Sequence, residues 1–466
     1  MMGNYQSGST PQETCNKVTD YFSLAWSGTY AAVQKGLIRE SEYSFWCYFL
    51  PKGIAGNYDG ALTARRVGLA IADCPTGRIY NKTTGECTFS ANKGTPPPLA
   101  CVQNPINITI GNKFQKIDDI KENGENSIEF SRYYNSLDQI WRHSYSANVK
   151  TYNDQYFNVT LADGAEFQYS LQDNVIQPLN GSTGKLEQTS TGWQFTSLSG
   201  DIYTFDQSGK ITGQRDASGH RHTIQWSSDH ALVSDDSGNT LTFTEDVIHQ
   251  PIAAASSGVT INYKYDNLAR LLEVTKLSGS SSSTTTLHYE DIQNNRLLTG
   301  ITDESGIRFA TWQYDSQGRA ISSSHAGGAD SGTITFGDND TATLTNEYGK
   351  SSVYSFVTVN GARRISSING TATPNCPSSN STFTYNAQGL LKTKTDAKGN
   401  LTTYDYNDRG LETSRTEASG TLQARTVTTE WHPSLYLKTK VTEPDRITTY
   451  QYDAQGRQTG QTVIPR

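Results

Sequence analysis

The sequence feature that most constrains the fold of this chain is a recurring strand-and-turn unit. Its clearest copy runs from Tyr450 to Arg457, where Tyr450 and Tyr452 alternate with polar residues ahead of an Asp-x-x-Gly segment. Side chains in a strand repeat every two residues, so the two rings share one face. Asp453 predicts the first position of a type I turn, and Gly456 predicts the positive φ of the turn exit.

The unit recurs through the second half of the chain. The spacing from Tyr385 to Tyr406 is 406 − 385 = 21 residues, and that from Tyr406 to Tyr452 is 452 − 406 = 46, which predicts a masked copy around Trp431. Repeats of this length predict stacked units that cannot bury a face alone. The signature positions are Tyr265, Asp266, Tyr314, Asp315, Gly318, Arg319, Tyr385, Gly389, Tyr406, Gly410, Tyr452, Asp453, Gly456 and Arg457.

This pattern resembles the YD repeat of RHS (rearrangement hot spot) proteins, the bacterial polymorphic-toxin shells. Upstream, the segment Asn104–Lys113 is similar to the opening of the uncharacterised domain that starts many RHS shells, and Phe130–Ser136 resembles its second signature. From residue 102 onward the resemblance covers 365 of 466 residues. It implies hairpins that pair edge to edge into one long sheet, which in the family spirals into a hollow shell around an effector.

Composition agrees with an extended β architecture. Hydrophobic residues make up 34% of the chain, which also contains 40 glycines and 26 tyrosines. Such a composition suits a sheet with many turns and one wetted face. The composition predicts a mostly β fold, and the RHS resemblance implies that it is a long antiparallel, spirally coiled sheet of stacked hairpins that forms a partial shell. A small disulfide-rich α+β module is expected to precede it.

Charge and hydropathy exclude two classes of partner. The net charge is −7 and the basic residues are scattered, so we expect no nucleic-acid partner. The longest apolar run, Phe45–Leu50, is far shorter than the roughly 20 residues that span a bilayer, so we expect no membrane span.

Five of the six cysteines lie in the first quarter of the chain, and this density is typical of an oxidising compartment. We expect disulfides between Cys15 and Cys47 and between Cys74 and Cys87; free, buried thiols are the alternative. These cysteines predict a secreted or cell-surface protein, although no apolar leader follows Met1. A start codon assigned too far downstream, or a signal-independent export apparatus, reconciles the many cysteines with the lack of an apolar leader.

Four domains are expected. Residues 1–73 form a small α+β cysteine-containing leader module with a helix over Thr10–Ala25 and a strand near Tyr43–Phe49. The remaining three are a cysteine-clipped hairpin and Pro-rich linker (74–101), the RHS-opening β domain (102–200) and the RHS/YD repeats (201–466). Within the repeats, the Ser/Thr-rich segment 278–286 predicts a flexible loop between two strands.

No catalytic constellation stands out, and we expect no enzyme, cofactor or metal site. His220 and His222 share one face of a predicted strand, but a metal there needs a third ligand, and exposed polar residues on a sheet are commoner. The chain has no phosphate-binding loop, no nucleophile elbow and no paired Cys and His.

Two functions follow from these observations. The first is a non-enzymatic structural shell segment of an RHS-type toxin or surface protein, which encloses or presents a C-terminal effector. RHS shells carry an Asp-Pro dipeptide where the toxin is released, and this sequence has none. The resemblance thus implies a partner: the missing C-terminal shell and toxin segment, or its immunity protein. The alternative is a secreted or cell-surface module that binds glycans through exposed aromatic residues.

Overall fold

The computed structural model describes residues 93–466 except 122–127, 153–154, 180, 218, 371–379 and 454–455. Before residue 93 it describes only the backbone of five strands, which form a three-stranded sheet and a hairpin. The expected helix over Thr10–Ala25 and the side chains of Cys15, Cys47, Cys74 and Cys87 lie outside the described residues. The five strands are β1 (Ala32–Arg39), β2 (Ser44–Pro51), β3 (Thr63–Gly68), β4 (Ile79–Asn81) and β5 (Glu86–Thr88).

Residues 93–179 build two small antiparallel sheets, to which we refer together as the plug. The five-stranded sheet has the order β10-β9-β8-β7-β6 and the four-stranded sheet the order β11-β12-β13-β14. The strands are β6 (Cys101–Val102), β7 (Ile106–Asn107), β8 (Asn112–Lys121), β9 (Glu129–Asn135), β10 (Ile140–His143), β11 (Asn148–Tyr152), β12 (Tyr156–Thr160), β13 (Glu166–Gln172) and β14 (Val175–Leu179).

All remaining strands belong to one antiparallel sheet of 26 strands, in which every strand pairs with its neighbours in sequence. Its first half consists of β15 (Lys185–Thr189), β16 (Gly192–Thr196), β17 (Ile202–Asp206), β18 (Ile211–Arg215), β19 (Arg221–Trp226), β20 (Ala231–Asp235), β21 (Thr240–Glu245), β22 (Pro251–Ser256), β23 (Val259–Tyr265), β24 (Leu271–Ser278), β25 (Ser281–His288), β26 (Gly300–Thr302) and β27 (Arg308–Tyr314).

The second half continues without a break in pairing, and a short 3-10 helix, η2 (Ala326–Gly328), interrupts the chain once. Its strands are β28 (Ala320–His325), β29 (Gly332–Gly337), β30 (Thr341–Asn346), β31 (Ser351–Val359), β32 (Ala362–Gly370), β33 (Asn380–Tyr385), β34 (Leu391–Thr395), β35 (Leu401–Tyr406), β36 (Glu412–Glu417), β37 (Arg425–Trp431), β38 (Lys438–Thr442), β39 (Arg446–Tyr452) and β40 (Gln458–Pro465).

This architecture confirms the expected mostly β fold with a long antiparallel, coiled sheet. The domain boundary expected at residue 200 falls between β16 and β17, inside that sheet. The expectation of a flexible loop over 278–286 is wrong, because Ser281–His288 is strand β25, and Gly279 and Ser280 alone form the turn. Threonine favours strands, and Thr275 and Thr284 join their hydroxyls across the hairpin at 3.2 Å.

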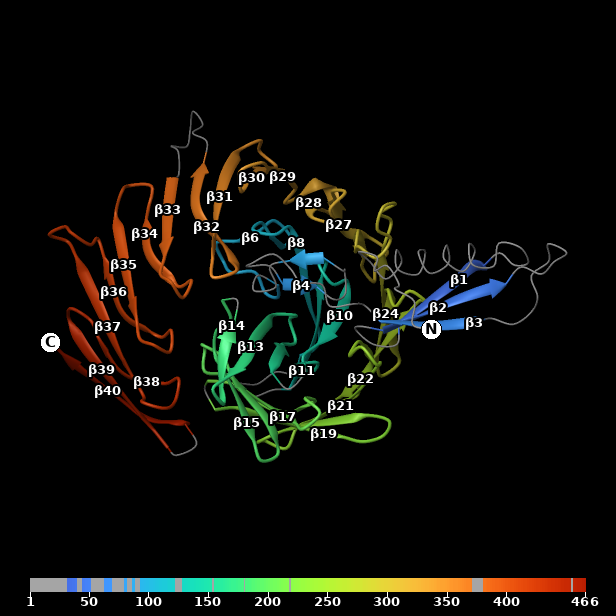
Figure 1. The fold of residues 1–466 in the computed structure, drawn as a ribbon, viewed down its shortest axis with the longest axis horizontal. Coiled ribbons are helices and arrows are strands. Elements are labelled where there is room, and N and C mark those ends of the chain that lie inside the picture. The colour runs from blue at the N-terminus through green and yellow to red at the C-terminus, as the bar shows by residue number, and fades with distance from the viewer. Residues whose placement is uncertain are drawn as a thin grey trace.

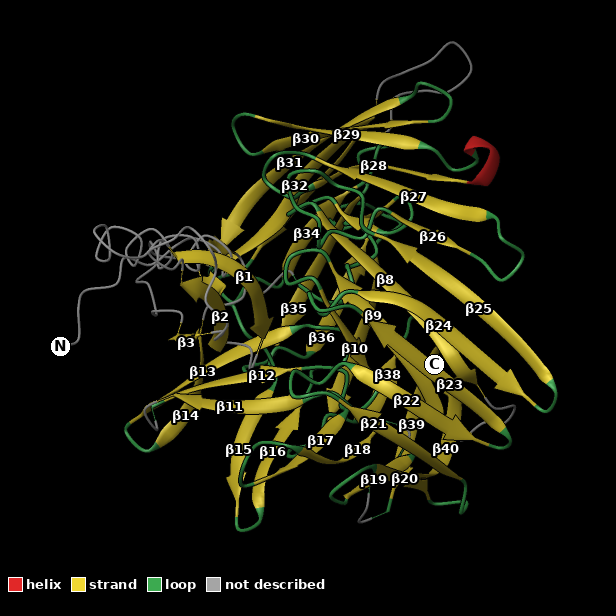
Figure 2. Ribbon diagram, turned by 90° about the vertical axis from the view of Figure 1, so that its right-hand side faces the viewer, coloured by secondary structure: helices red, strands yellow, loops and turns green. Residues whose placement is uncertain are grey.

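The long sheet curls around the plug. Figure 1 shows β15–β32 running around β6–β13, with the last strands returning beside the first. A Cβ built on Gly200 would lie 3.3 Å from Tyr436 O, and one on Gly219 would lie 2.8 Å from Arg457 Cγ. The turns after β37 and β39 therefore contact those after β16 and β18, an offset of 37 − 16 = 39 − 18 = 21 strands. In the side view of Figure 2 the strand direction changes from one part of the sheet to another, so that β24 and β25 slope opposite to β31 and β32.

One continuous hydrophobic core joins the plug to the inner face of the sheet. Phe130, Tyr134 and Trp141 of the plug are at most 1% exposed, and they belong to the same cluster as Phe243 and Trp312 of the sheet. Alternate residues of the curled strands point inward, as the period of two predicts. The interior of this part of the sheet is therefore filled by the chain itself.

Candidate functional site

The interior of the curled sheet is the candidate functional site, and the plug fills part of it. Arg132 on β9 lies across the plug–sheet boundary from Tyr263 on β23, and both contact Asp119 of the plug. The Arg132 guanidinium donates to Asp119 at 2.8 Å and the Tyr263 hydroxyl donates to the same carboxylate at 2.6 Å. All three are buried. A buried charge is tolerated only when it is paired and hydrogen-bonded, so these three residues hold the plug against β23 of the sheet.

Two aromatic residues of the plug make polar contacts with the segment around β26. The Tyr134 hydroxyl accepts a hydrogen bond from Leu298 N at 3.0 Å and donates to Arg296 O at 3.2 Å. The indole N–H of Trp141 donates to the Tyr289 hydroxyl at 3.0 Å. Burial raises the pKa of Tyr134 well above its ordinary value, so the hydroxyl stays protonated.

Backbone hydrogen bonds attach the plug to two repeat turns. Val149 N on β11 donates to Gly209 O at 2.8 Å, and Ala320 N of the sheet donates to Gly111 O at 2.8 Å. Both glycines have positive φ, and a Cβ on Gly111 would lie 2.5 Å from Arg319 Cβ. At these two points no side chain fits between plug and turn.

The opening motif of the plug, Asn104–Lys113, contacts β27. Lys113 is fully buried, and its ammonium donates to Asn104 O, Phe114 O and Gln115 Oε1 within 2.9 Å. It also lies 4.1 Å from the centre of the Trp312 ring, whose indole N–H donates to the same Asn104 O. Burial lowers the pKa of Lys113 well below its ordinary value. The three oxygen acceptors and the ring face oppose this lowering of the pKa, because they stabilise the ammonium form.

The second motif, Phe130–Ser136, is organised by Asn135. Its Oδ1 accepts from Gly94 N at 3.2 Å and from Asn112 Nδ2 at 2.8 Å, while its own Nδ2 donates to Asp163 O at 2.7 Å. One buried amide thus joins the start of the described chain, the first motif and the four-stranded sheet. The motif therefore holds these three parts of the plug together.

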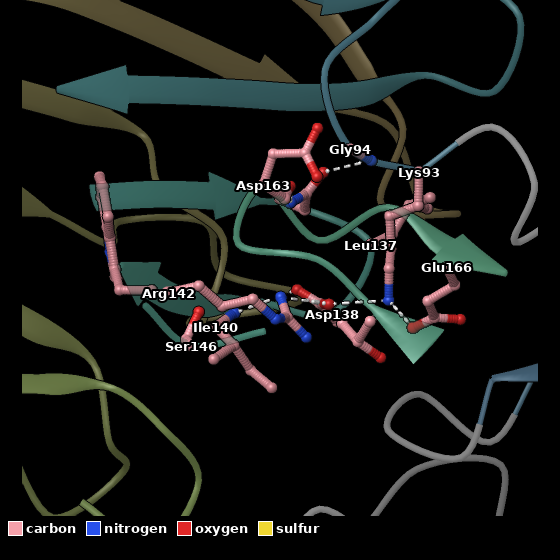
Figure 3. A network of polar contacts seen from close by, with 12 residues as sticks. Lys93, Gly94, Leu137, Asp138, Ile140, Arg142, Ser146, Asp163 and Glu166 are labelled. Atoms are coloured by element: carbon pink, nitrogen blue, oxygen red, sulfur yellow. Dashed lines mark hydrogen bonds and ion pairs between the residues drawn. The ribbon is translucent and has the colours of Figure 1, made fainter. Parts of the chain in front are cut away.

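A buried charge network completes the plug (Figure 3). Asp138, whose side chain is fully buried, lies 2.9 Å from Lys93 Nζ and 2.7 Å from Arg142 Nη1, and Lys93 also pairs with Glu166. Burial by itself raises the pKa of Asp138, but Arg142 and Lys93 hold it below its ordinary value of 3.8. The network ties residue 93 to β13 and to the β9–β10 turn. Nothing in the sequence pattern singles out these residues.

The signature aspartates, glycines and arginines lie at the turns of the long sheet, and the signature tyrosines end the strands that lead into these turns. In the copy at Asp315, Asp315 N donates to Arg319 O and Gly318 N donates to Asp315 O, each at 2.9 Å, which closes a three-residue turn with Gly318 at φ 75°. The carboxylate accepts from Gln317 N and Arg319 N at 3.0 Å, and its other oxygen accepts from Arg319 Nε at 2.7 Å. The aspartate therefore satisfies the turn backbone and the arginine together.

Other copies vary on this geometry. Asp266–Arg270 and Asp453–Arg457 repeat the carboxylate–guanidinium pair at 2.7 Å. At Gly389 and Gly410 the turn begins with asparagine, which has a single acceptor oxygen, and leucine replaces the arginine. Ala269 holds the left-handed position of the Asp266 turn at φ 58°.

The signature tyrosines connect neighbouring strands. A shift in strand register falls immediately before each of Tyr265, Tyr314, Tyr385, Tyr406 and Tyr452, and also before Trp431. The hydroxyl of each of the last four tyrosines donates to a backbone carbonyl at or beside the preceding strand: Leu298, Ile365, Leu391 and Lys438. Trp431 does the same with its indole N–H, to Glu412 O at 2.8 Å, so it occupies the position of a masked copy.

A pocket of about 350 Å³ opens between the plug and β17–β19. Its lining includes Tyr133 of the plug and Tyr203, Gln214, His220 and His222 of the sheet. Among the described residues no group of three or more His, Cys, Asp or Glu side chains is placed to hold a metal. Cys101 is a free thiol in the described part of the chain, and no helix there has the length and apolarity to cross a membrane.

Two family models match the chain. Residues 103–169 match a domain of unknown function (DUF6531), and residues 385–422 match the RHS repeat. The chain therefore contains an RHS repeat. The first match coincides with the plug and contains both of its motifs, and the second contains the turns of Gly389 and Gly410.

Solved structures resemble this RHS-repeat protein at low identity. The Photorhabdus luminescens Tc holotoxin pore is 10% identical over 91% of this chain and 26% of its own, with a TM-score of 0.35. The TcdB2-TccC3 crystal structure is 11% identical over 91% of this chain and 23% of its own, with a TM-score of 0.32. The chain thus spans about a quarter of each of these chains. A comparison with curated proteins finds no match.

Proposed function

We propose that this RHS-repeat protein is a non-enzymatic wall segment of a toxin or surface protein, and that its curled sheet encloses or presents an effector polypeptide. The supporting observation is that buried residues are distributed unequally along the long sheet. Each strand from β17 to β32 contributes a buried residue, whereas β34–β38 contain none. The later strands therefore offer an inner face that the described plug does not cover.

The proposed partner is the C-terminal shell and toxin segment of the same system, or its immunity protein, at the cell surface or outside the cell. The aromatic side chains Tyr404, Tyr406 and Trp431 on β35 and β37 are half-buried. Such side chains are common at protein interfaces, because they combine apolar area with a polar group.

Glycan binding is the competing proposal, and the repeat tyrosines argue against it. A tyrosine that donates a hydrogen bond to a sugar needs a free hydroxyl proton, whereas Tyr314, Tyr385, Tyr406 and Tyr452 donate theirs to backbone carbonyls. Their position supports a role in joining hairpins. Tyr348, which is 84% exposed, is a residue at which a glycan contact remains testable.

Native purification followed by limited proteolysis and mass spectrometry tests the proposal. We expect a polypeptide from outside residues 1–466 to co-purify, and to resist protease until urea unfolds the sheet. A bare monomer that binds glycans on an array, and loses that binding in Tyr348→Ala, would instead establish the glycan function.

A further inference from the structure

We propose that the plug–sheet junction is proton-sensitive: uptake of a proton by His143 separates the plug from the inner face of the long sheet, which we call plug opening. The inference goes beyond the proposed wall function, because it holds whether or not the interior carries an effector. It starts from the histidines. Of the eight in the chain, His143, His222 and His325 form hydrogen bonds across the plug–sheet boundary, and His249 shares the carboxylate of Glu245 with His143.

His143 is the one histidine on the plug side of this junction. It ends β10, is 0% exposed, and its ring stacks on Phe130 of the plug at 5.1 Å and 14°. On the sheet side the ring of Phe243 lies 4.6 Å away. Figure 1 places β10 inside the curve formed by β21–β24. An imidazole between two phenyl rings has no access to water that would solvate an added charge.

The hydrogen bonds of His143 hold it in its neutral form. Nδ1 accepts from the backbone N–H of Tyr145 at 3.3 Å, so that nitrogen carries no proton. Nε2, 3.0 Å from Glu245 Oε2, therefore donates to the carboxylate. A second proton would have to sit on Nδ1, facing the Tyr145 N–H, and two donors cannot share that contact.

The charged groups around His143 come from Arg132, its cross-strand neighbour on β9, and from three parts of the sheet. Glu245 on β21 is the direct partner, but its other oxygen already lies 2.9 Å from His249 Nδ1 and 3.5 Å from Lys210 Nζ. Asp246 contributes a further negative charge. Burial lowers the pKa of His143, and the hydrogen bond to Glu245 only partly offsets it. Glu245 itself stays ionised, because the hydrogen bonds from His143 and His249 outweigh its burial and hold its pKa below the ordinary value.

His222, at the edge of the junction, is a second histidine whose pKa is lowered by burial and which contacts Tyr145. Its Nδ1 lies 3.1 Å from Gln214 Nε2 and 3.4 Å from the Tyr145 hydroxyl, so Tyr145 contacts both histidines. Burial lowers the pKa of His222, opposed by Asp235, Asp216 and Asp236 and reinforced by His220. The 350 Å³ pocket between plug and sheet is lined by His222 and by Ser144, the neighbour of His143. It brings solvent to the junction.

The direction of the effect follows from linkage. A histidine with a lowered pKa in the closed state binds fewer protons there than in the open state, so acid favours opening. The closed state is favoured most above the ordinary histidine pKa of 6.5, and this preference is lost as the pH falls toward the pKa of the buried form. Each proton taken up on opening raises the opening equilibrium by up to about tenfold per pH unit.

Amide hydrogen exchange of the full chain, corrected for the intrinsic pH dependence of exchange, tests the proposal. Between pH 7.5 and 5.5 we expect peptides of Glu129–Tyr152 to lose protection by about tenfold or more, while peptides of β34–β37 do not. His143→Gln keeps an amide donor for Glu245 but takes up no proton, so it removes most of this pH dependence. His230→Gln is the matched control, because His230 is exposed and contacts residues of its own turn.

Equal pH dependence in wild type and His143→Gln, or no loss of plug protection in the wild type, would overturn the proposal. If His143→Gln does not fold at pH 7.5, the ¹⁵N spectrum of histidine-labelled wild-type protein decides. Protonation of a buried histidine together with loss of plug protection supports plug opening. A histidine set that titrates fully while the plug stays protected refutes it.

Discussion

Gly209→Ala measures how closely the plug lies on the sheet. Gly209 occupies the left-handed position of the Asp206 turn at φ 85°, and a Cβ there would overlap Val149 O, whose carbon it would approach to 2.8 Å. Gly238 holds the same position in the Asp235 turn at φ 88°, with no atom within 4 Å of its Cβ site. Both substitutions pay the left-handed penalty of about 1–2 kcal/mol. Only Gly209→Ala also displaces β11.

The added cost of Gly209→Ala comes from the plug contact. Displacing β11 breaks the 2.8 Å hydrogen bond from Val149 N to Gly209 O and leaves a buried donor unpaired, which costs about 1–3 kcal/mol. We therefore expect Gly209→Ala to lower the free energy of unfolding by about 2–5 kcal/mol and Gly238→Ala by about 1–2 kcal/mol, measured by urea denaturation. Equal losses in the two variants would refute the docking of the plug on this turn.

Three further predictions follow from single contacts. Tyr134→Phe leaves the buried Leu298 N–H without its acceptor and should lower the free energy of unfolding by about 1–3 kcal/mol. The half-buried control Tyr385→Phe should lower it by less, and equal urea midpoints for the two variants would contradict this prediction. Asp138→Asn removes the negative charge that pairs with the buried Lys93 and Arg142, and it should lower the free energy of unfolding by about 3–5 kcal/mol. Because its pKa is lowered, Asp138 stabilises above pH 3.8 and this contribution is lost on acidification, so the variant should show a flatter stability–pH profile below that value. Asp315→Asn keeps one turn acceptor and should cost less than Asp315→Ala, for which we expect a loss of about 1–2 kcal/mol; a reversed order in thermal melts would count against the turn assignment.

The local units were accessible from sequence because their chemistry is local. The turns at Asp315 and Asp453 each close within five residues, so one aspartate, one glycine and the alternation before them carry the information. The two plug motifs, Asn104–Lys113 and Phe130–Ser136, could also be recognised from the sequence, but the residues that they contact could not. Composition misled at 278–286, where the pairing of β24 with β25 decides the structure.

The sequence by itself determined the repeating hairpin, its likeness to the RHS repeat and the mostly β class, since each rests on residues that are near neighbours in the chain. Only the tertiary structure decided that the interior of the curled sheet is occupied by residues 93–179, and that the sheet meets itself after 21 strands. Contacts such as His143 with Glu245 and Tyr134 with Leu298 join residues 102 and 164 positions apart. They depend on the accumulated twist and curl of many strands, which no short motif encodes.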